Sequence, residues 1–545
     1  MQVFRKDIRK YGKLTLVVII SLMLMLSSTL ISSATMVSDY KAYVMAPLEK
    51  ITDWTAFKNQ LITLKNNGVY ALTTDVWWGY VEPNADNQFD WSYYKTYADT
   101  VRAAGIKWVP IISTHQCGGN VGDNVNIPLP AWLWTKDTAD KMQYKDEAGN
   151  MDKQAIAPWW TGIAQQYDEL YASFASNFSG YKDIIAKIYL SAGSSGELRY
   201  PSYNPSHGWN YPGRGYLECY TETAKTNFRN AMQTKYGTIA ALNTAWGTSL
   251  TSFTQINPPS DGDTFFINGY KSNYGKDFLT WYQGSLTKHL ATIASKAHAR
   301  FDTVFGVRIG AKISGVHWRY SDPTMPHCAE YCAGYYNYST ILDQFKTSNL
   351  DLTFTCLEMT DSNTSPNYSM PKTLVIQVAN LAKSKGIKIN GENALAISNN
   401  PTAYQNCAEM AFNYNFSGFT LLRLANIVSS NGTATSEMAP FKDALVLKPV
   451  PVTFTINNAN AATGQTVYVS GSRWELGKWT TGTYPLQLTK NASGQWVGTC
   501  YLGAGVTYEF KGIKKSSTGV VWEGGNNKVY TIPAAGGSYT WTWTN

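Results

Sequence analysis

The sequence has no second long apolar run, no basic tract and no paired spacing of metal ligands. After residue 34, no stretch reaches the roughly 20 apolar residues that a membrane-spanning helix needs. Lysines and arginines are scattered, so the charge pattern gives no reason to expect a nucleic-acid partner. The seven cysteines form no CxxC pair, which argues against a zinc site, and no disulfide framework for a chain of 545 residues. Because their number is odd, at least one thiol is expected to be unpaired.

A secretory signal peptide is predicted at residues 1–34. Five basic residues precede the apolar run Leu14–Leu26, which is too short to span a bilayer comfortably, and Ser32, Ser33 and Ala34 form a small-residue cleavage site. An uncleaved membrane anchor is the less favoured alternative, because no further apolar residues extend the run. We therefore expect a secreted, extracellular protein without a membrane attachment after cleavage, whose net charge falls from +8 to about +4.

Aromatic residues are abundant, with 19 Trp and 36 Tyr. Large barrels bury many aromatic side chains, but exposed rings are also how proteins stack on sugar rings. The composition therefore favours a carbohydrate ligand over the nucleic-acid and metal classes.

Strand-like apolar runs alternate with longer helical stretches from residue 35 to residue 447. The helical stretches include Lys95–Ala104, Tyr167–Phe178, Gly275–Arg300 and Thr373–Lys385. Eight strands with intervening helices predict an α/β fold, a (β/α)8 TIM barrel with long βα loops, although a doubly wound sheet would give a similar pattern. The expected strands are Tyr43–Leu48, Tyr70–Val76, Trp108–Ser113, Ile185–Leu190, Phe305–Ile313, Leu352–Leu357, Ile387–Ile389 and Phe419–Leu424.

Polar residues stand at or just beyond the carboxyl ends of these strands, where barrel enzymes build their active sites. Two of them are glutamates in similar settings, since Glu197 and Glu392 each follow a strand-like run and a glycine. Hydrolysis of a glycosidic bond uses one carboxylic acid and one carboxylate on opposite sides of that bond. The sequence therefore predicts that these two glutamates face each other across a sugar-binding cleft. The other strand-end residues are Asp75, His115, Lys312, Glu358 and Arg423.

The pattern changes after Leu447. Prolines at alternate positions in residues 448–451 predict a stiff, extended linker. Residues 452–545 then show short alternating strands separated by Gly and Asn turns, which is typical of an all-β sandwich.

Two stretches resemble the signatures of the β-amylases. His115–Asp123 is similar to the loop that covers the cleft in that family, and Gly193–Tyr203 is similar to the segment that carries the catalytic acid. The resemblance spans residues 40–447 and is closest to the bacterial β-amylases. It implies exo-acting hydrolysis of α-1,4-glucosidic bonds, with inversion, that releases β-maltose from the non-reducing ends of starch, amylose and maltooligosaccharides. It also implies Glu197 as the general acid and Glu392 as the general base.

The same resemblance implies a set of substrate-binding residues. Lys312 would donate to a sugar hydroxyl or keep Glu392 ionised, and Thr355 would bind the attacking water or Glu392. The residues that would grip glucose hydroxyls are Asp75, His115, Asp123 and Arg423, and those that would line the floor are Asn393, Ala394 and Leu395.

One structural calcium ion is expected by resemblance to some bacterial β-amylases. Glu82, Asp86, Asn87 and Glu169 offer the hard oxygen ligands that calcium prefers. Gln166 stands where a further acidic ligand is expected, and a solvated acidic loop without an ion is the alternative. The chemistry of the two glutamates needs no cofactor.

Residues 452–545 resemble the starch-binding domains of amylases and glucoamylases. The matching stretches are Val467–Gly471, Glu475–Trp479, Tyr508–Lys511 and Val521–Asn527. The resemblance implies Trp479 and Trp522 as a stacking platform for α-glucan, with Lys511, Glu523 and Asn527 as polar contacts. Because the loop Thr489–Ser493 has no aromatic residue, the second sugar site of these domains is expected to be weak or lost.

Two other functions are compatible with the residues. A retaining barrel glycosidase also carries carboxylates after two of its strands, but those enzymes usually have Asn before the first glutamate, where this chain has Gly196. A non-catalytic starch-binding protein could keep the same scaffold, although both glutamates are present. We expect a monomer.

Overall fold

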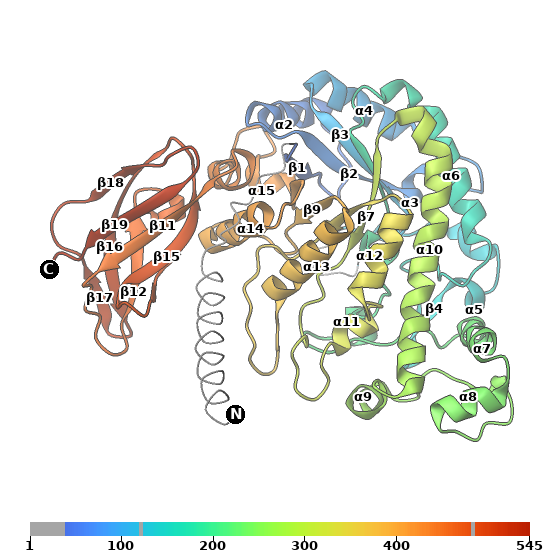
Figure 1. Cartoon of the computed structure of the whole chain (residues 1–545). Coiled ribbons are helices and arrows are strands. Elements are labelled where there is room, and N and C mark those ends of the chain that lie inside the picture. The colour runs from blue at the N-terminus through green and yellow to red at the C-terminus, as the bar shows by residue number, and fades with distance from the viewer. Residues whose placement is uncertain (1–38, 119–123, 481–485) are drawn as a thin grey trace, which may run out of the picture.

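The computed structural model describes residues 39–118, 124–480 and 486–545 (Figure 1). The predicted signal peptide at residues 1–34 and the predicted ligand Asp123 lie outside the described residues. Within the described ranges, no helix is both long enough and apolar enough to cross a membrane.

In the part of the chain that the structure describes, eight parallel strands close into a barrel in the order β1-β10-β9-β8-β7-β6-β3-β2. Every predicted barrel strand overlaps one of these, so the prediction of a TIM barrel is confirmed and the doubly wound alternative, which leaves an open sheet, is excluded. The strands are β1 (Lys41–Met45), β2 (Ala71–Trp77), β3 (Lys107–Ser113), β6 (Lys187–Leu190), β7 (Arg308–Ile313), β8 (Asp351–Phe354), β9 (Ile389–Glu392) and β10 (Gly418–Leu421).

Helices surround the barrel (Figure 1). Long loops, some of which contain short helices, connect the strands to the helices that follow them. Two short strands, β4 (Tyr144–Lys145) and β5 (Met151–Asp152), pair within one of these loops. The longer helices are α2 (Trp54–Asn66), α4 (Ser92–Ala104), α6 (Ile163–Phe178), α7 (Glu222–Tyr236), α8 (Ile239–Trp246), α10 (Asn273–Phe305), α12 (Tyr338–Thr347), α13 (Pro371–Lys385) and α14 (Pro401–Asn413). The short ones are α3 (Trp78–Val81), α5 (Ala139–Met142), α9 (Gly262–Thr264), α11 (Cys328–Cys332), α15 (Leu424–Ile427) and α16 (Met438–Phe441).

Helix α10 extends further than its sequence pattern predicts. Its N-cap Ser272 accepts from the backbone N–H of Gly275, and the helix continues to Phe305 before Gly306 ends it in a left-handed conformation with φ of 63°. Phe305 and Gly306, predicted as the start of a strand, therefore belong to the helix and its cap, and β7 begins at Arg308. Along its length α10 packs against α6, where Arg300 forms a bidentate ion pair with Asp168.

The core between sheet and helices is dominated by aromatic rings. Trp108 on β3 is fully buried and packs against Tyr97 of α4 and against Phe174 and Phe178 of α6. Fully burying rings of this size removes a large apolar area from water, so much of the abundant Trp and Tyr serves the core.

An ion cluster closes the amino-terminal end of the barrel. Asp351, at the start of β8, is 1% exposed and binds the Lys187 ammonium of β6 at 2.8 Å. Arg308, at the start of β7, donates to the same carboxylate from Nε at 2.9 Å. Because parallel strands begin at the same end of the sheet, one carboxylate on β8 can bind a cation from the adjacent strand β7 and another from β6, one strand further along.

The C-terminal domain is a sandwich of two sheets, in the strand orders β14-β15-β11-β19 and β13-β12-β16-β17, with β18 paired to β16. Its first strand already begins at Val450, inside the predicted linker, which is therefore shorter than residues 448–451. Pro451 is tolerated there because β19 pairs with β11 only from Val452 onward, so at Pro451 the strand has a neighbour on one side only. The strands are β11 (Val450–Asn457), β12 (Thr466–Gly471), β13 (Leu486–Gln487), β14 (Thr489–Lys490), β15 (Trp496–Leu502), β16 (Thr507–Ser516), β17 (Gly519–Trp522), β18 (Lys528–Thr531) and β19 (Gly537–Thr542).

The sandwich docks against α14 of the barrel domain (Figure 1). Trp474, the first residue of the 3-10 helix η8 (Trp474–Trp479), and Tyr501 on β15 pack into the same apolar cluster as the barrel core. The side-chain amide of Gln405 on α14 pairs with both backbone groups of Tyr501, at 2.7 and 2.9 Å. The two domains therefore share a buried, hydrogen-bonded interface.

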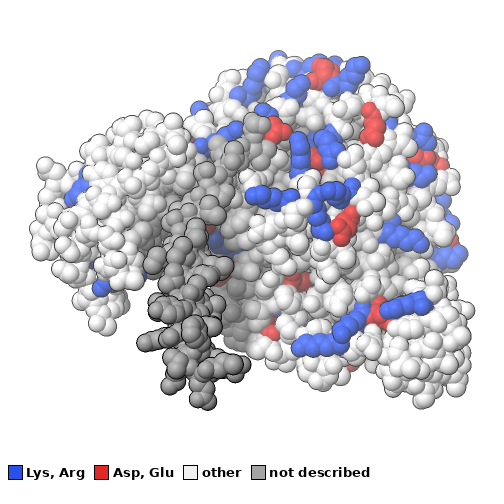
Figure 2. Space-filling model, viewed as in Figure 1, with Lys and Arg blue, Asp and Glu red and all other residues white. Residues whose placement is uncertain are grey.

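The surface carries charges of both signs. On the face in Figure 2, Lys and Arg side chains are interspersed with Asp and Glu over the barrel domain, and few charged side chains appear on the C-terminal domain. All seven cysteines lie in described ranges, where all are buried and none is joined in a disulfide bond.

The buried ion cluster leads to a stability prediction. Asp351→Ala should lower the free energy of unfolding by about 3–5 kcal/mol, because it leaves the Lys187 ammonium buried without a carboxylate. Urea unfolding of the full chain, followed by tryptophan fluorescence, measures the change. Asp343→Ala, which removes a surface pair with Lys385, is the matched control and should change the value by less than about 1 kcal/mol. Similar small effects of both variants would contradict the prediction.

Candidate active site

A cavity of about 940 Å³ opens at the carboxyl ends of the barrel strands. Its walls come from segments that follow most of the eight strands, which is the arrangement that lets one fold bring distant residues together. Ten of the predicted catalytic and substrate-binding residues line it: Asp75, His115, Glu197, Lys312, Thr355, Glu392, Asn393, Ala394, Leu395 and Arg423. Asp123, the eleventh, lies outside the described residues.

Glu197 follows a tight turn after β6. Gly193 approaches the backbone so closely that an added Cβ would lie 2.5 Å from the carbonyl oxygen of Arg199. Gly196 has a φ of 77°, and a Cβ there would lie 2.9 Å from the ring of His115. Glycine is therefore required at both positions if the turn is to direct Glu197 into the cavity.

Arg199 holds the Glu197 carboxylate. This guanidinium is 2% exposed, and its Nε donates to Glu197 Oε2 at 2.9 Å while Nη2 donates to Ser195 Oγ at 2.7 Å. The ring of Tyr203 lies 4.0 Å below the guanidinium carbon. These contacts fix Arg199, so one carboxylate oxygen of Glu197 has a defined position and the other stays available to the cavity.

Glu392 ends β9 and forms a buried ion pair with Lys312 of β7. The ammonium contacts both carboxylate oxygens, at 2.8 and 3.0 Å, and both residues are less than 10% exposed. Burial raises the pKa of Glu392, the charge of Lys312 offsets part of that rise, and the charge of Glu197 adds to it. Of the two predicted functions of Lys312, the structure places its ammonium on Glu392.

The floor of the cavity is held by a third carboxylate, Glu358, which follows β8. Its oxygens accept from the backbone N–H groups of Ala394 and Leu395 at 2.7–3.1 Å. Burial raises the pKa of Glu358 to about 7, although these N–H groups favour its charged form. Asn393 continues the floor by bonding to both backbone groups of Leu422. Glu358 was noted as a strand-end residue, but its function in the floor follows only from these contacts.

The remaining predicted residues are anchored by neighbours in the wall. His115 pairs with Ser191 Oγ through Nδ1 at 2.8 Å, and Asp75 accepts from Ser113 Oγ at 2.8 Å. Thr355 Oγ1 accepts from the backbone N–H of Gly315 at 2.8 Å, so its hydroxyl hydrogen remains available to donate. Arg423 Nη1 donates to the carbonyl of Ala46 at 3.3 Å.

Four aromatic rings at one side of the cavity were not predicted from the sequence. Tyr203 and Trp209 each lie within 6 Å of Trp318, and Tyr211, which is 49% exposed, lies 5.8 Å from the same ring. All four line the cavity. Exposed rings beside a cavity are suited to stacking on sugar rings. The segment Gly208–Gly213, which supplies two of them, could have been identified by its paired aromatic residues.

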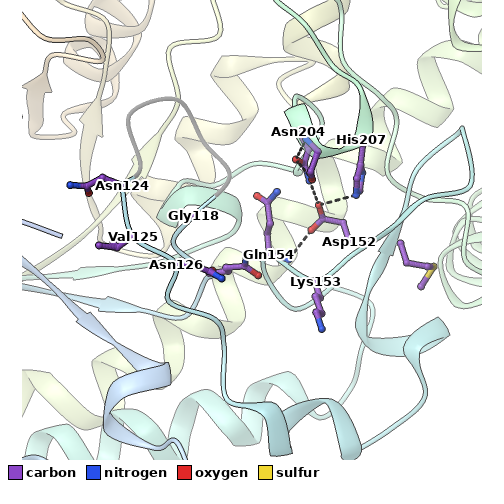
Figure 3. Close-up of a pocket in the computed structure, with 12 residues that line it drawn as sticks. Gly118, Asn124, Val125, Asn126, Asp152, Lys153, Gln154, Asn204 and His207 are labelled. Atoms are coloured by element: carbon purple, nitrogen blue, oxygen red, sulfur yellow. Dashed lines mark hydrogen bonds and ion pairs between the residues drawn. The ribbon is translucent and has the colours of Figure 1, made fainter. Parts of the chain in front are cut away.

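A second recess of about 550 Å³ adjoins the cavity and shares Gln116 with it (Figure 3). Its base is built by Asp152, which accepts from Asn204 Nδ2 at 2.7 Å and from the backbone N–H of Gln154 at 2.7 Å. His207 approaches the same carboxylate at 3.9 Å. Both Asp152 oxygens thus have hydrogen-bond partners, whereas His207 Nδ1 is buried without one.

The five predicted calcium ligands lie close to one another on α6 and in the loop after α3. Burial raises the pKa of Glu82 to about 7, to which the charges of Asp86 and Glu169 contribute, and Asp86 Oδ1 is buried without a hydrogen-bond partner. However, Lys136 binds Asp86, and the Gln166 amide donates to Glu169. No three His, Cys, Asp or Glu side chains of the described ranges converge as a metal site. The set fits a cation only if the amide oxygens of Asn87 and Gln166 complete it.

In the C-terminal domain, Trp479 and Trp522 lie together, with ring centroids 6.2 Å apart and planes at 48°. Lys511 and Asn527 lie near them, bonded to Gly525 O and Glu509 respectively. Glu523, predicted as a sugar contact, is instead 2% exposed. Its oxygens accept from the backbone N–H of Gly512, the Trp541 indole and the Lys528 ammonium, so it stabilises the fold rather than facing a ligand.

Comparisons with known proteins agree with this site. Residues 43–451 match Glycosyl hydrolase family 14 and residues 449–542 match a starch binding domain. The chain is 64% identical to a thermophilic beta-amylase of Thermoanaerobacterium thermosulfurigenes over 544 residues, 98% of each chain. It is 50% identical to a beta-amylase of Bacillus cereus over 542 residues, 97% of this chain and 98% of that one. The solved catalytic domain of a Paenibacillus polymyxa beta-amylase is 60% identical and covers 76% of this chain and 99% of its own, with a TM-score of 0.74.

The barrel, its paired carboxylates and the appended sandwich define a glycoside hydrolase with a starch-binding domain. The chain belongs to glycosyl hydrolase family 14. The resemblance identified from the sequence is thereby confirmed at the level of the family.

Proposed function

We propose that this enzyme hydrolyses α-1,4-glucosidic bonds of starch, amylose and maltooligosaccharides from the non-reducing end and releases β-maltose with inversion. The observation that carries the proposal is that Glu197 and Glu392, each with its own buried cation, line one cavity. The names of the relatives, which are beta-amylases, support the same activity.

The proposed reaction uses the two carboxyl groups in different protonation states. Glu197, protonated, donates its proton to the glycosidic oxygen as the bond from that oxygen to C1 breaks. Glu392, ionised, takes a proton from a water whose oxygen bonds to C1 from the opposite face, so the anomeric configuration inverts. Each cycle consumes one water, and both carboxyl groups then exchange protons with solvent. Arg199 and Lys312 fix the positions of the two groups before the substrate enters.

We further propose that the enzyme is secreted and acts as an extracellular monomer. The basic start, the apolar run and the small-residue site at residues 1–34 support secretion. The starch-binding domain would bring the enzyme to insoluble substrate, where a tethered module raises the local substrate concentration.

Product analysis tests the proposed reaction. A time course on amylose, followed by proton NMR, should show maltose as the product with an initial β-anomer signal. Glu197→Gln and Glu392→Gln should each lower kcat by about 10²–10⁴-fold, because each removes one proton transfer. Glu222→Gln, an exposed glutamate on α7, is the control and should retain wild-type turnover. An initial α-anomer would instead indicate a retaining glycosidase, and starch binding without any sugar release would indicate a non-catalytic protein.

Lys312 leads to a pH prediction. The base must be ionised, so the rate is lost as the pH falls through the pKa of Glu392. The charge of Lys312 lowers that pKa, and Lys312→Met should therefore move the acid limb of the kcat/KM profile on maltopentaose to higher pH. The position of the limb can be read even if the maximum rate falls. Lys225→Met, on the surface of α7, serves as control, and an acid limb that stays in place in Lys312→Met would be evidence against Glu392 as the base.

We also propose a calcium ion at Glu82, Asp86, Asn87, Gln166 and Glu169, supported by the unpartnered Asp86 Oδ1 and the raised pKa of Glu82. A ligand that binds only the folded state raises the melting temperature. Millimolar calcium should therefore raise Tm relative to EDTA in the wild type, and Asp86→Asn should abolish that rise. Equal Tm values of the wild type in calcium and in EDTA would exclude the site.

A further inference from the structure

The loop at residues 393–400 connects the proposed base to helix α14 and forms the floor of the cavity. It follows Glu392 directly, and five of its residues line the cavity: Asn393, Ala394, Leu395, Ala396 and Asn400. Leu395 is 54% exposed to the cavity and solvent, so few apolar contacts hold this part of the loop. Ile397, which is 1% exposed, packs its side chain into the barrel core, and hydrogen bonds hold the backbone on either side of it.

Different carboxylates hold the two ends. At the start, Glu358 accepts from the backbone N–H groups of Ala394 and Leu395. At the end, Glu437, which is 8% exposed, accepts from the backbone N–H of Asn399 at 3.1 Å. The same Oε2 atom of Glu437 accepts from the hydroxyl of Tyr404 at 3.1 Å. A single oxygen thus joins the end of the floor loop to a side chain of α14.

Tyr404 is buried by the C-terminal domain as well as by the barrel domain. It is 1% exposed, and the indole of Trp474 meets its ring edge to face, with centroids 5.5 Å apart. Trp474 is fixed in turn by its N–H to Asp443 Oδ2 at 3.2 Å, and Arg473 donates to the same oxygen at 2.7 Å. Beside Tyr404 on α14, Gln405 is bonded to the backbone of Tyr501.

These contacts form a continuous path from the C-terminal domain to the floor of the cavity. Trp474 fixes the ring of Tyr404, the Tyr404 hydroxyl fixes Glu437, and Glu437 fixes Asn399. Without Trp474, the Tyr404 ring loses one wall of its site and can take other rotamers, and its hydroxyl no longer holds the Glu437 carboxylate in place.

We propose that the C-terminal domain positions the floor of the active site through Trp474, Tyr404 and Glu437, in addition to binding starch. The consequence for turnover rests on the proposed function. In this view Tyr404, Glu437 and Trp474 are positioning residues, and the C-terminal domain affects hydrolysis of small soluble glucans that need no granule binding.

Two variants of the full chain separate this contribution from starch binding. Tyr404→Phe keeps the ring packing and removes the hydroxyl bond to Glu437, and Trp474→Ala removes the contact from the other domain. Tyr236→Phe is the matched control, since it removes a tyrosine hydroxyl bond to Asp277 between α7 and α10, far along the chain from the loop. The readouts are backbone hydrogen exchange in the peptide covering residues 393–400, and kcat on maltopentaose at a temperature well below Tm.

Tyr404→Phe and Trp474→Ala should exchange faster than the wild type in residues 393–400, and their kcat should fall three- to tenfold. Tyr236→Phe should match the wild type in both measurements, and Tyr404→Phe should bind starch granules as well as the wild type. Unchanged exchange in Tyr404→Phe overturns the proposal, as does faster exchange with wild-type kcat. If Trp474→Ala does not fold, Trp474→Leu, which keeps an apolar side chain against Tyr404 but removes the edge-to-face ring contact, takes its place. A wild-type protein that releases no sugar from maltopentaose refutes the proposed function, while hydrogen exchange still tests the positioning.

Discussion

Two buried cations hold the two carboxylates of the cavity, and the barrel is arranged so that both contacts can form. Arg199 binds Glu197 from two residues away in the same turn, whereas Lys312 binds Glu392 across the barrel from β7 to β9. Burying an unpaired carboxylate is costly, and removing Lys312 would leave Glu392 as one. The contacts therefore explain why charged groups can stand this deep in the site, and they require strands β6, β7 and β9 to keep a fixed register.

That register is supported at both ends of the barrel. At the upper end, Glu197 pairs with Lys312 in a parallel bridge, and the N–H of Leu198 donates to the Lys312 carbonyl at 2.8 Å. At the lower end, the Lys187 and Arg308 cations share Asp351 across β6, β7 and β8. A shift of one residue along β7 would turn Lys312 away from Glu392 and Arg308 away from Asp351, because side chains alternate between the two faces of a strand. The lower cluster thus helps to specify the geometry of the upper one, although it lies at the opposite end of the barrel.

The sequence was sufficient to predict the barrel strands and most of the residues that line the cavity, because both are determined by local patterns. Apolar runs bounded by glycine predict strands, and the carboxyl ends of strands in a barrel converge whatever the intervening loops contain. What the sequence could not supply were contacts between distant side chains. Glu523 stands in a motif typical of sugar-binding loops, yet it is enclosed by Trp541 and Lys528, and only the packed sandwich reveals this. The short strand β17 has three exposed residues out of four, so it lacks the alternating pattern from which a strand can be predicted.

The C-terminal domain is docked on the barrel domain, and this limits the positions that the predicted platform of Trp479 and Trp522 can take. A flexible linker would give the platform a range of positions, so its effect on the local substrate concentration would depend on linker length. Here strand β11 begins at Val450, three residues after Leu447 ends the last turn of the barrel domain, and the interface with α14 is buried. The segment η8, whose backbone departs from helical geometry at Leu476, Gly477 and Lys478, carries Trp474 at one end and Trp479 at the other. Trp479 and Trp522, the predicted platform, are therefore carried by a docked domain and not by a flexible tether. The same rigidity lets a surface module stabilise the floor beneath the proposed base, so substrate capture and active-site geometry depend on one interface.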